Sequence, residues 1–392
     1  MDLDFSEADD AFRAEVRDWL AAHVPATPLP SLESAEGFAA HRDWEAELSD
    51  GRWSVVSWPE EYGGRGASIL RWLVFEEEYY AAGAPGRVSQ NGINLLAPTL
   101  FEHGTAEQRA RILPAMARGE VIWAQAWSEP ESGSDLASLK STARRTDGGW
   151  LLSGQKTWSS RAAFADRAFG LFRSDPDAGK PHHGLTYLMF PLDAEGVTVR
   201  PIGRLDGRPA FAELFLDDVF VPDEDVIGEP GQGWRVAMST TGNERGLTLR
   251  SPGRFTAAAD RLTALWRERA DPADTALRDR VADAVIGARA YRLFSYAGAS
   301  RVLHDDDDGP AGAASSLNKV YWSELDIALH ETALDLLGPS GELADHAEES
   351  PAHGAWAEGY TFALAGPIYA GTNEIQRDII AERLLGLPKG RR

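Results

Sequence analysis

The period of the hydrophobic pattern changes twice along the 392 residues, and these changes restrict the fold more than any other feature. Apolar residues recur at helical spacing up to about residue 120, as in segments 7–23 and 72–82. Short strand-like runs bounded by turn residues replace that spacing up to about residue 230. Helical spacing returns after Gly233, so the order of helices, strands and helices predicts an α+β protein.

The length of the chain predicts several domains, because 392 residues exceed what one hydrophobic core usually organises. We expect an N-terminal helical domain at 1–120, a middle β domain at 121–230 and a C-terminal helical domain at 231–392. The middle domain is expected to be a small sandwich or barrel, and the C-terminal domain to resemble a four-helix bundle. The strands of the middle domain are expected at 149–154, 185–190, 197–199 and 212–216. The helices of the C-terminal domain are expected at 234–249, 254–269, 275–303, 315–337 and 372–385.

Composition excludes several classes of function. The chain has no cysteine, which removes disulfides and thiolate chemistry, and its nine histidines show no metal-ligand spacing, so no metal site is expected. A formal net charge of −22 argues against nucleic-acid binding, which needs clustered Lys and Arg. No stretch is apolar enough to span a membrane, and the acidic start is unlike a secretory signal. These features predict a cytoplasmic protein, with the acidic run 305–310 as a solvated loop.

Two segments of the middle region combine small, polar and aromatic residues. Residues 125–135 read QAWSEPESGSD, a bend whose backbone N–H groups and small hydroxyls can approach a planar, electron-accepting ring. Residues 154–160 read GQKTWSS, and Trp158 could pack on such a ring. Each segment alone has a structural explanation, as a polar loop between domains or as a core tryptophan in a strand.

A third segment lies near the C-terminus, where residues 366–388 read GPIYAGTNEIQRDIIAERLLGLP. Gly371 permits a close approach of the backbone, and Thr372 is suited to cap a helix that begins there. The N-terminus of that helix could hold the polar atoms or phosphates of a ligand.

Together these segments resemble the signatures of the acyl-CoA dehydrogenase family, with Ser128, Ser159 and Ser160 replacing the usual residues. The stretches 57–66 and 102–108 extend the resemblance over almost the whole chain. The resemblance implies FAD bound between the middle domain and the C-terminal helices, and an acyl-CoA or carrier-protein thioester as substrate. It assigns the cofactor to Gln125, Trp127, Ser128, Gly133, Ser134, Trp158, Ser159, Ser160, Thr372 and Glu374, and the substrate to Ser134, Arg245 and Gly371.

The base that removes the α proton is displaced in this chain. Many family members carry it as a glutamate at the position of Ala370, which cannot act as a base. Other members carry it on the first long helix of the C-terminal domain, and residues 242–246, GNERG, resemble that segment. The resemblance therefore implies Glu244 as the catalytic base, and the alternative is a surface Glu244 in a helix ion pair.

Two further departures concern the partners of the chain. The family's Arg-x-x-Phe-Gly segment is absent from 265–275, and its Gly-Gly-x-Gly turn is reduced at 337–342. Both segments bind flavin phosphates across a subunit interface, so the resemblance allows a homo-oligomer such as a tetramer, or an α2β2 heterotetramer with a related subunit. An electron-transfer flavoprotein is the implied acceptor. A flavin monooxygenase or N-hydroxylase, and a non-catalytic subunit, remain as alternative functions.

Overall fold

The computed structural model describes residues 5–245, 251–303, 311–343 and 347–389, without the side chains of 243–245, 302–303 and 311–314. The chain divides into two compact units. The helical unit comprises Met1–Val24, Ala67–Ala84 and Arg245–Arg392, and the sheet unit comprises Pro25–Gly66 and Pro85–Glu244. Helices precede and follow a strand-rich middle, which confirms the predicted fold class. The predicted loop at 305–310 lies outside the described residues.

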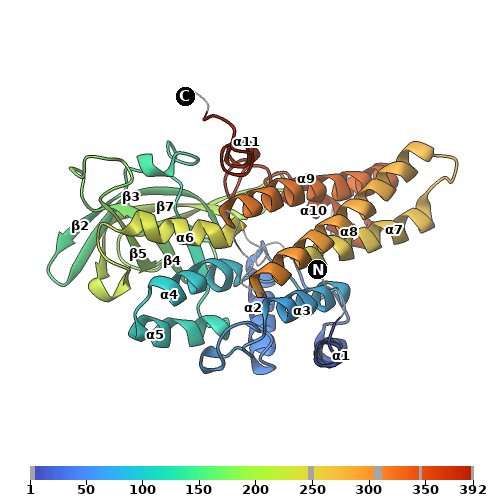
Figure 1. Ribbon diagram of the computed structural model, residues 1–392, viewed down its shortest axis with the longest axis horizontal. Helices are drawn as coiled ribbons and strands as arrows, with labels where there is room; N and C mark the ends of the chain where they lie inside the picture. Colours follow the sequence, from blue (N-terminus) through green and yellow to red (C-terminus); the bar gives the residue numbers. More distant parts are fainter. Residues whose placement is uncertain (1–4, 246–250, 304–310, 344–346, 390–392) are drawn as a thin grey trace. The chain divides into compact units, whose positions relative to one another are not determined.

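The helical unit packs long helices around one apolar core. Figure 1 shows α7, α8 and α9 running alongside one another, and their buried residues include Phe255, Tyr291 and Trp322. No helix among the described residues is long and apolar enough to cross a membrane. The helices of this unit are α1 (Glu7–His23), α3 (Ile69–Ala81), α7 (Pro252–Arg269), α8 (Thr275–Leu303), α9 (Ala311–Leu337), α10 (Ala355–Ala363) and α11 (Asn373–Ile379).

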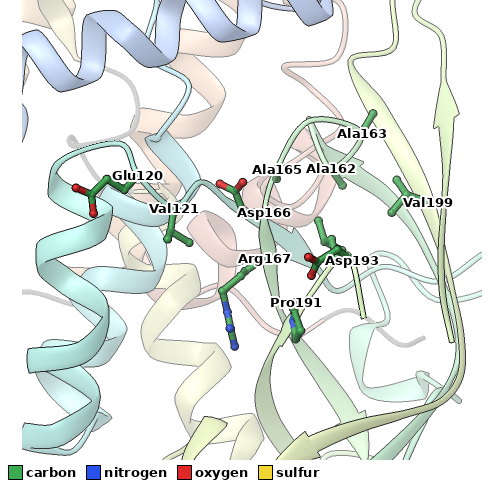
Figure 2. Close-up of a pocket in the computed structure, with 11 residues that line it drawn as sticks. Glu120, Val121, Ala162, Ala163, Ala165, Asp166, Arg167, Pro191, Asp193 and Val199 are labelled. Atoms are coloured by element: carbon green, nitrogen blue, oxygen red, sulfur yellow. The ribbon is translucent and has the colours of Figure 1, made fainter. Parts of the chain in front are cut away.

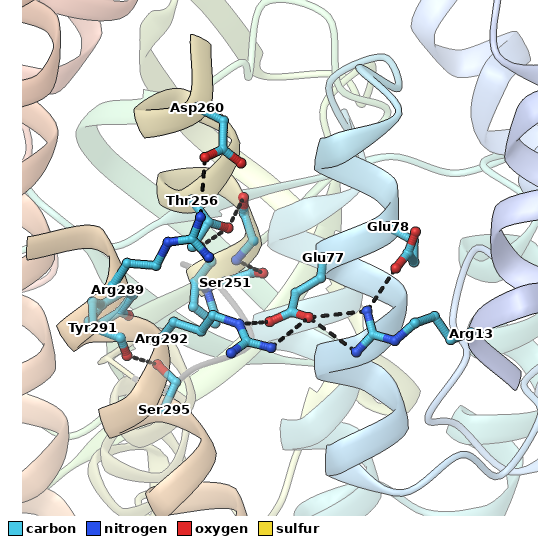
Figure 3. Close-up of polar contacts among 12 residues, drawn as sticks. Arg13, Glu77, Glu78, Ser251, Thr256, Asp260, Arg289, Tyr291, Arg292 and Ser295 are labelled. Atoms are coloured by element: carbon cyan, nitrogen blue, oxygen red, sulfur yellow. Dashed lines mark hydrogen bonds and ion pairs between the residues drawn. The ribbon is translucent and has the colours of Figure 1, made fainter. Parts of the chain in front are cut away.

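Partly buried ion pairs join three of these helices. Arg13 of α1 donates hydrogen bonds to Glu77 (3.3 Å) and to Glu78 (2.7 Å), both on α3 (Figure 3). Arg17 reinforces the contact with Glu78 at 2.9 Å, and Arg292 of α8 bonds Glu77 from the other side. Both carboxylates are therefore shared between guanidinium groups, which fixes α3 against α1 and α8.

The sheet unit contains eight strands among its described residues. Hydrogen bonding gives the order β6-β7-β3-β2-β4-β5-β8, and β1 pairs in parallel with β4. The strands are β1 (Trp123–Ala126), β2 (Thr142–Thr146), β3 (Gly149–Ser160), β4 (Arg167–Arg173), β5 (Leu185–Pro191), β6 (Val197–Ile202), β7 (Phe211–Pro222) and β8 (Val226–Ile227).

Two cores lie on opposite faces of the central strands. On β5, Tyr187 belongs to a core shared with helices, whereas Leu188 and Phe190 belong to a core between strands. Both faces of β5 are buried, and accordingly its sequence is mainly apolar without alternation, with Thr186 as its one small polar residue. The helices of this unit are α2 (Ala35–Asp50), α4 (Ala97–His103), α5 (Ala106–Ala117) and α6 (Gly233–Arg245), of which the last three contribute to the first core.

Candidate functional site

A bend that follows β1 carries the first group of predicted cofactor residues. Gln125 lies on β1, where it pairs with Phe169 of β4. Trp127 is buried with its ring edge against Tyr187, at a centroid distance of 6.1 Å. The indole Nε1 of Trp127 is also buried, and it has no hydrogen-bond partner among the described residues. An orphaned buried donor of this kind is a position at which a ligand acceptor would lower the energy of the site.

The second half of the bend is mostly exposed to solvent. Ser128 is half-buried, and Gly133 and Ser134 are exposed. A Cβ built on Gly133 would meet no atom within 4 Å, so protein packing does not require glycine there. A backbone bridge between Glu129 and Ser132 closes the bend, with N–H to carbonyl distances of 2.8 and 3.0 Å. The exposed backbone beyond that bridge is therefore accessible to a ligand.

Strand β3 brings the second group beside the first. The backbone N–H of Thr157 donates to the carbonyl of Ser128 at 2.8 Å, so the two sequence segments are in direct contact. Register with β7 shifts between Lys156 and Ser159, and inside this irregularity Trp158 has a left-handed φ of +60°. As a result Trp158 is 60% exposed, and its ring contacts Phe211 in a T-shaped arrangement at a centroid distance of 5.9 Å.

The two serines after Trp158 differ in their surroundings. Ser159 is buried, and its Oγ has no hydrogen-bond partner among the described residues. Ser160 is half-buried and pairs with Phe211 of β7. An unpaired, buried hydroxyl and a half-buried serine thus follow the exposed tryptophan in the chain.

Two charged residues that the sequence analysis did not assign lie beneath these segments. Lys156 is fully buried, and its ammonium donates to a carboxylate oxygen of Glu129 at 2.9 Å. Burial lowers the pKa of Lys156 to about 8, and the charge of Glu129 opposes that shift. Burial alone would raise the pKa of Glu129, but the charge of Lys156 and several hydrogen bonds outweigh it, so the net shift is downward. A signal was present in the sequence, namely a charged residue within each motif.

The predicted base lies at the end of α6. Glu244 and Arg245 belong to the last turn of this helix, but their side chains lie outside the described residues. Seven and four residues earlier, Ala237 and Thr240 are fully buried. Helical spacing therefore puts the backbone of Glu244 on the same face of α6 as these two residues. The Thr240 hydroxyl fixes that face through a 2.7 Å hydrogen bond with Thr99.

The remaining predicted residues form a separate group in the helical unit. Ala370 and Gly371 have left-handed φ values of +57° and +77°, which turns the chain sharply before α11. Thr372 is the N-cap of that helix, and its hydroxyl accepts from the backbone N–H of Ile375 at 3.3 Å. Glu374 is exposed, and its pKa is lowered by a hydrogen bond with its own backbone and by another with Thr372.

The turn itself is held by buried polar side chains. The amide of Gln376 donates to the carbonyl of Ala370 at 2.8 Å, while its own Oε1 is buried without a partner among the described residues. Lys319 donates to Asn373 at 2.8 Å. These contacts make the turn at Ala370 and Gly371 a fixed feature of the helical unit.

The sheet unit also contains a cavity that the sequence analysis did not predict. Its volume is about 500 Å³, and Figure 2 shows Glu120, Asp166 and Asp193 around it, together with small apolar side chains. Asp166 already accepts hydrogen bonds from Arg42 (3.2 Å) and from the backbone of Ile122 (2.6 Å). None of the predicted site residues lines this cavity.

The residues of the sheet unit fit the flavin implied by the resemblance. Trp158 offers an exposed aromatic face for a planar ring system. In the same two contacting segments, the orphaned Nε1 of Trp127 and the orphaned Oγ of Ser159 are donors that could bond the carbonyl oxygens and nitrogens of such a ring. Gly133 leaves the bend uncrowded. A planar, acceptor-rich cofactor would satisfy all of these groups.

Comparison with known proteins identifies the family. Family models for the N-terminal, middle and C-terminal domains of acyl-CoA dehydrogenases match residues 6–120, 124–219 and 231–385. The chain is 39% identical to acyl-CoA dehydrogenase IpdE1 of Mycobacterium tuberculosis, over 97% of this chain and 98% of that protein.

Two solved structures are similar over the full length of both chains. One is the Tcur3481-Tcur3483 steroid ACAD (29% identity, TM-score 0.88), and the other is the ChsE4-ChsE5 complex from Mycobacterium tuberculosis (28% identity, TM-score 0.83). The chain therefore belongs to the acyl-CoA dehydrogenase family and is an FAD-dependent oxidoreductase.

Proposed function

We propose that this chain dehydrogenates an acyl-CoA between its α and β carbons, with Glu244 as the base. The observation that carries the proposal is the exposed ring of Trp158, which follows Thr157, the residue whose backbone N–H bonds the bend at Ser128. An aromatic platform next to unpaired hydrogen-bond donors is what a flavin enzyme needs to hold its ring system. The donors are the Trp127 and Ser159 groups described above.

The reaction removes two hydrogens and two electrons from the substrate. Glu244 takes the α proton, the β hydrogen leaves as a hydride, and a double bond forms between the two carbons. FAD, when bound, supplies the acceptor for that hydride. The chain has to hold the carboxylate and the flavin ring on either side of the same carbon–carbon bond. We assign the thioester to Ser134, Arg245 and Gly371, and polar atoms of the cofactor to Thr372 and Glu374.

The position of Glu244 on α6 supports its role as the base. Its backbone lies on the helix face that buries Ala237 and Thr240. Ala370, at the other position used by the family, has only a methyl group. Transfer into an apolar pocket would raise the pKa of a carboxylate towards the working pH, which suits a general base.

We infer that the acyl group is bulky and ring-bearing, as in a steroid-derived thioester. The support is the similarity, over the full length of both chains, to a solved structure named as a steroid ACAD. Replacing a glutamate by Ala370 also leaves more room at the turn before α11. An electron-transfer flavoprotein is proposed as the electron acceptor, on the family resemblance.

The proposal is tested by following the visible absorbance of the purified, flavin-loaded chain anaerobically while acyl-CoA thioesters are added. A panel of straight-chain and steroid-derived thioesters identifies the acyl group that bleaches the flavin band. Glu244→Gln is expected to keep bound flavin but to slow bleaching by about 10²- to 10⁴-fold, because the amide cannot accept the α proton.

Glu229→Gln is the matched control, since Glu229 is an exposed acid shortly before α6. This control is expected to bleach at the wild-type rate. Wild-type flavin that no thioester bleaches would refute the dehydrogenase proposal. Wild-type bleaching in Glu244→Gln would instead refute only the assignment of the base.

A further inference from the structure

We propose that Lys156 and Glu129 are positioning residues, which lock the bend at 125–134 and the Trp158 irregularity of β3 into one rigid flavin-contacting surface. The inference rests on the proposed function, because that surface matters only if flavin binds there. Neither side chain is exposed, and the Lys156 ammonium and both Glu129 carboxylate oxygens already have hydrogen-bond partners within the protein, so neither residue offers a free group to the substrate. Their effect must pass through the backbone segments that they hold.

Lys156 uses every donor of its ammonium group within the protein. Besides Glu129, it donates to the backbone carbonyls of Trp127 at 3.2 Å and Leu171 at 2.8 Å. These three acceptors come from the bend and from β4. An ammonium has three donors, so none is left over for a ligand or a proton relay. The geometry therefore gives Lys156 the function of a three-way anchor.

Glu129 closes the loop that contains the exposed part of the bend. One carboxylate oxygen accepts from the backbone N–H of Lys140 at 2.6 Å, and the other accepts from that of Ser141 at 2.9 Å and from Lys156. The carboxylate of Glu129 therefore ties together the two ends of the segment that runs from Glu129 to Lys140. Gly133 and Ser134 lie in this segment, so the same anchor sets their positions.

The anchor reaches Trp158 through two residues of β3. Lys156 points into the core, the next residue, Thr157, holds the Ser128 carbonyl through its N–H, and Trp158 then turns outwards with its left-handed φ. A displacement of the Lys156 backbone would move the Ser128 contact and the Trp158 ring together. The relative position of bend and platform is therefore set at Lys156.

Stability alone does not account for this pair. The cost of removing two charges from water commonly equals or exceeds their mutual attraction, and well-packed apolar residues stabilise a core as effectively. Apolar residues could not supply three directed hydrogen bonds to Trp127, Leu171 and Glu129. The ion pair adds hydrogen bonds of fixed direction, and several of them go to backbone groups of the bend and of the residues that follow it.

The test compares three variants, Lys156→Met, Glu129→Gln and the double variant that carries both changes. Each single variant leaves one buried charge unpaired and is expected to lose stability. The double variant removes both charges, so it keeps the test valid if the single variants fail to fold. Lys180→Met is the control, because Lys180 is an exposed lysine on the loop between β4 and β5.

Three measurements on the double variant report on the flavin-contacting surface itself, and acceleration of exchange confined to that surface distinguishes a local effect from a general loss of stability. Amide hydrogen exchange is expected to accelerate at 140–141 and 157–160, where the anchored N–H groups lie. The absorbance bands of bound oxidised flavin are expected to shift. The kcat for the substrate is expected to fall by about 10- to 100-fold with a smaller change in KM, because misplacement affects the reacting geometry more than thioester binding.

A double variant with wild-type exchange, wild-type flavin bands and wild-type kcat would overturn the inference, since neutralising the charges would then be sufficient. If the purified chain holds no flavin, the hydrogen-exchange measurement alone tests the inference, and wild-type exchange in the double variant would overturn it. The outcome is separable from the proposed function, because exchange and the oxidised flavin spectrum are measured without substrate. Flavin that no thioester reduces would refute the dehydrogenase proposal and leave both of these measurements standing.

Discussion

Trp158 is held in a backbone conformation that glycine adopts more readily than any other residue. A left-handed φ of +60° costs a residue with a Cβ about 1 to 2 kcal/mol, and 60% of this residue's surface is exposed. The isolated chain therefore gains little from tryptophan here, either by burial or by local geometry. Contact with a planar ligand would supply the compensating energy, which is why we regard Trp158 as the platform for the flavin ring.

Trp158→Ala is expected to weaken flavin binding by up to about tenfold, which corresponds to the loss of one aromatic stacking interaction. Thermal stability of the flavin-free chain should change little, because the ring is mostly exposed. Flavin titration followed by fluorescence measures the affinity. Phe220→Ala is the matched control, since Phe220 is 51% exposed on the neighbouring strand β7 and should leave the affinity unchanged. Equal losses in the two variants would contradict the platform assignment.

At the scale of elements, the sequence predicts helices better than strand ends. Helix 7–23 has the predicted bounds because Ser6 caps it and Phe12, Val16 and Leu20 recur on one buried face. Strand β3 runs to Ser160, six residues beyond the predicted end. Gly154, with φ +143°, and the buried charge of Lys156 break the apolar alternation on which that prediction depended.

The C-terminal helix is shorter than predicted, whereas strand β3 is longer. Its predicted span of 372–385 is an α-helix only over Asn373–Ile379, and a π-helical turn at Ile380–Leu384 follows. Among the site residues, the two motifs that contain Ser128 and Trp158 are in contact through the backbone hydrogen bond from Thr157 to Ser128, and their roles toward the cofactor stay predictions. The roles of Lys156 and Glu129 could not be predicted, because their partners are set by strand pairing across the sheet.

The contact between α1 and α3 gives a prediction at this scale. Glu78→Gln is expected to lower the free energy of unfolding by about 1 to 3 kcal/mol, because Arg13 and Arg17 lose a charged acceptor. Burial raises the pKa of Glu78, but the hydrogen bonds from Arg17 and Arg13 outweigh it, and the net shift is downward. The wild-type contribution is therefore complete above the unfolded pKa of a glutamate and is lost as the pH falls through the lower folded value.

Denaturant unfolding at neutral and acidic pH measures this contribution as the difference between wild type and Glu78→Gln. That difference should shrink on acidification. Glu349→Gln, at an exposed acid of the same unit, should match wild type at both pH values. A difference that grew on acidification would show that the Glu78 contact is not stabilised by its charge.

For the whole molecule, α8 indicates that the chain assembles with another. One face of this helix, including Ala288 and Tyr291, is buried in the core of the helical unit. On the opposite face, Ile286 is 65% and Leu293 is 43% exposed. A helix that is apolar on two opposite faces is expected to be covered on both. We call this second face the α8 stripe; its members recur every three or four residues and are Ala282, Ile286, Ala290, Leu293 and Ala297.

A second copy of this chain is the partner that we expect for the α8 stripe, because an exposed apolar helix face can be buried against the same face of another copy. A double variant with Ile286→Asp and Leu293→Asp is expected to weaken assembly by roughly a hundredfold or more, because two carboxylates would be buried without partners. Size-exclusion chromatography with light scattering measures this loss. Leu205→Asp, at an 80% exposed position of the sheet unit, should assemble like wild type. Wild-type assembly of the stripe variant would place the interface elsewhere.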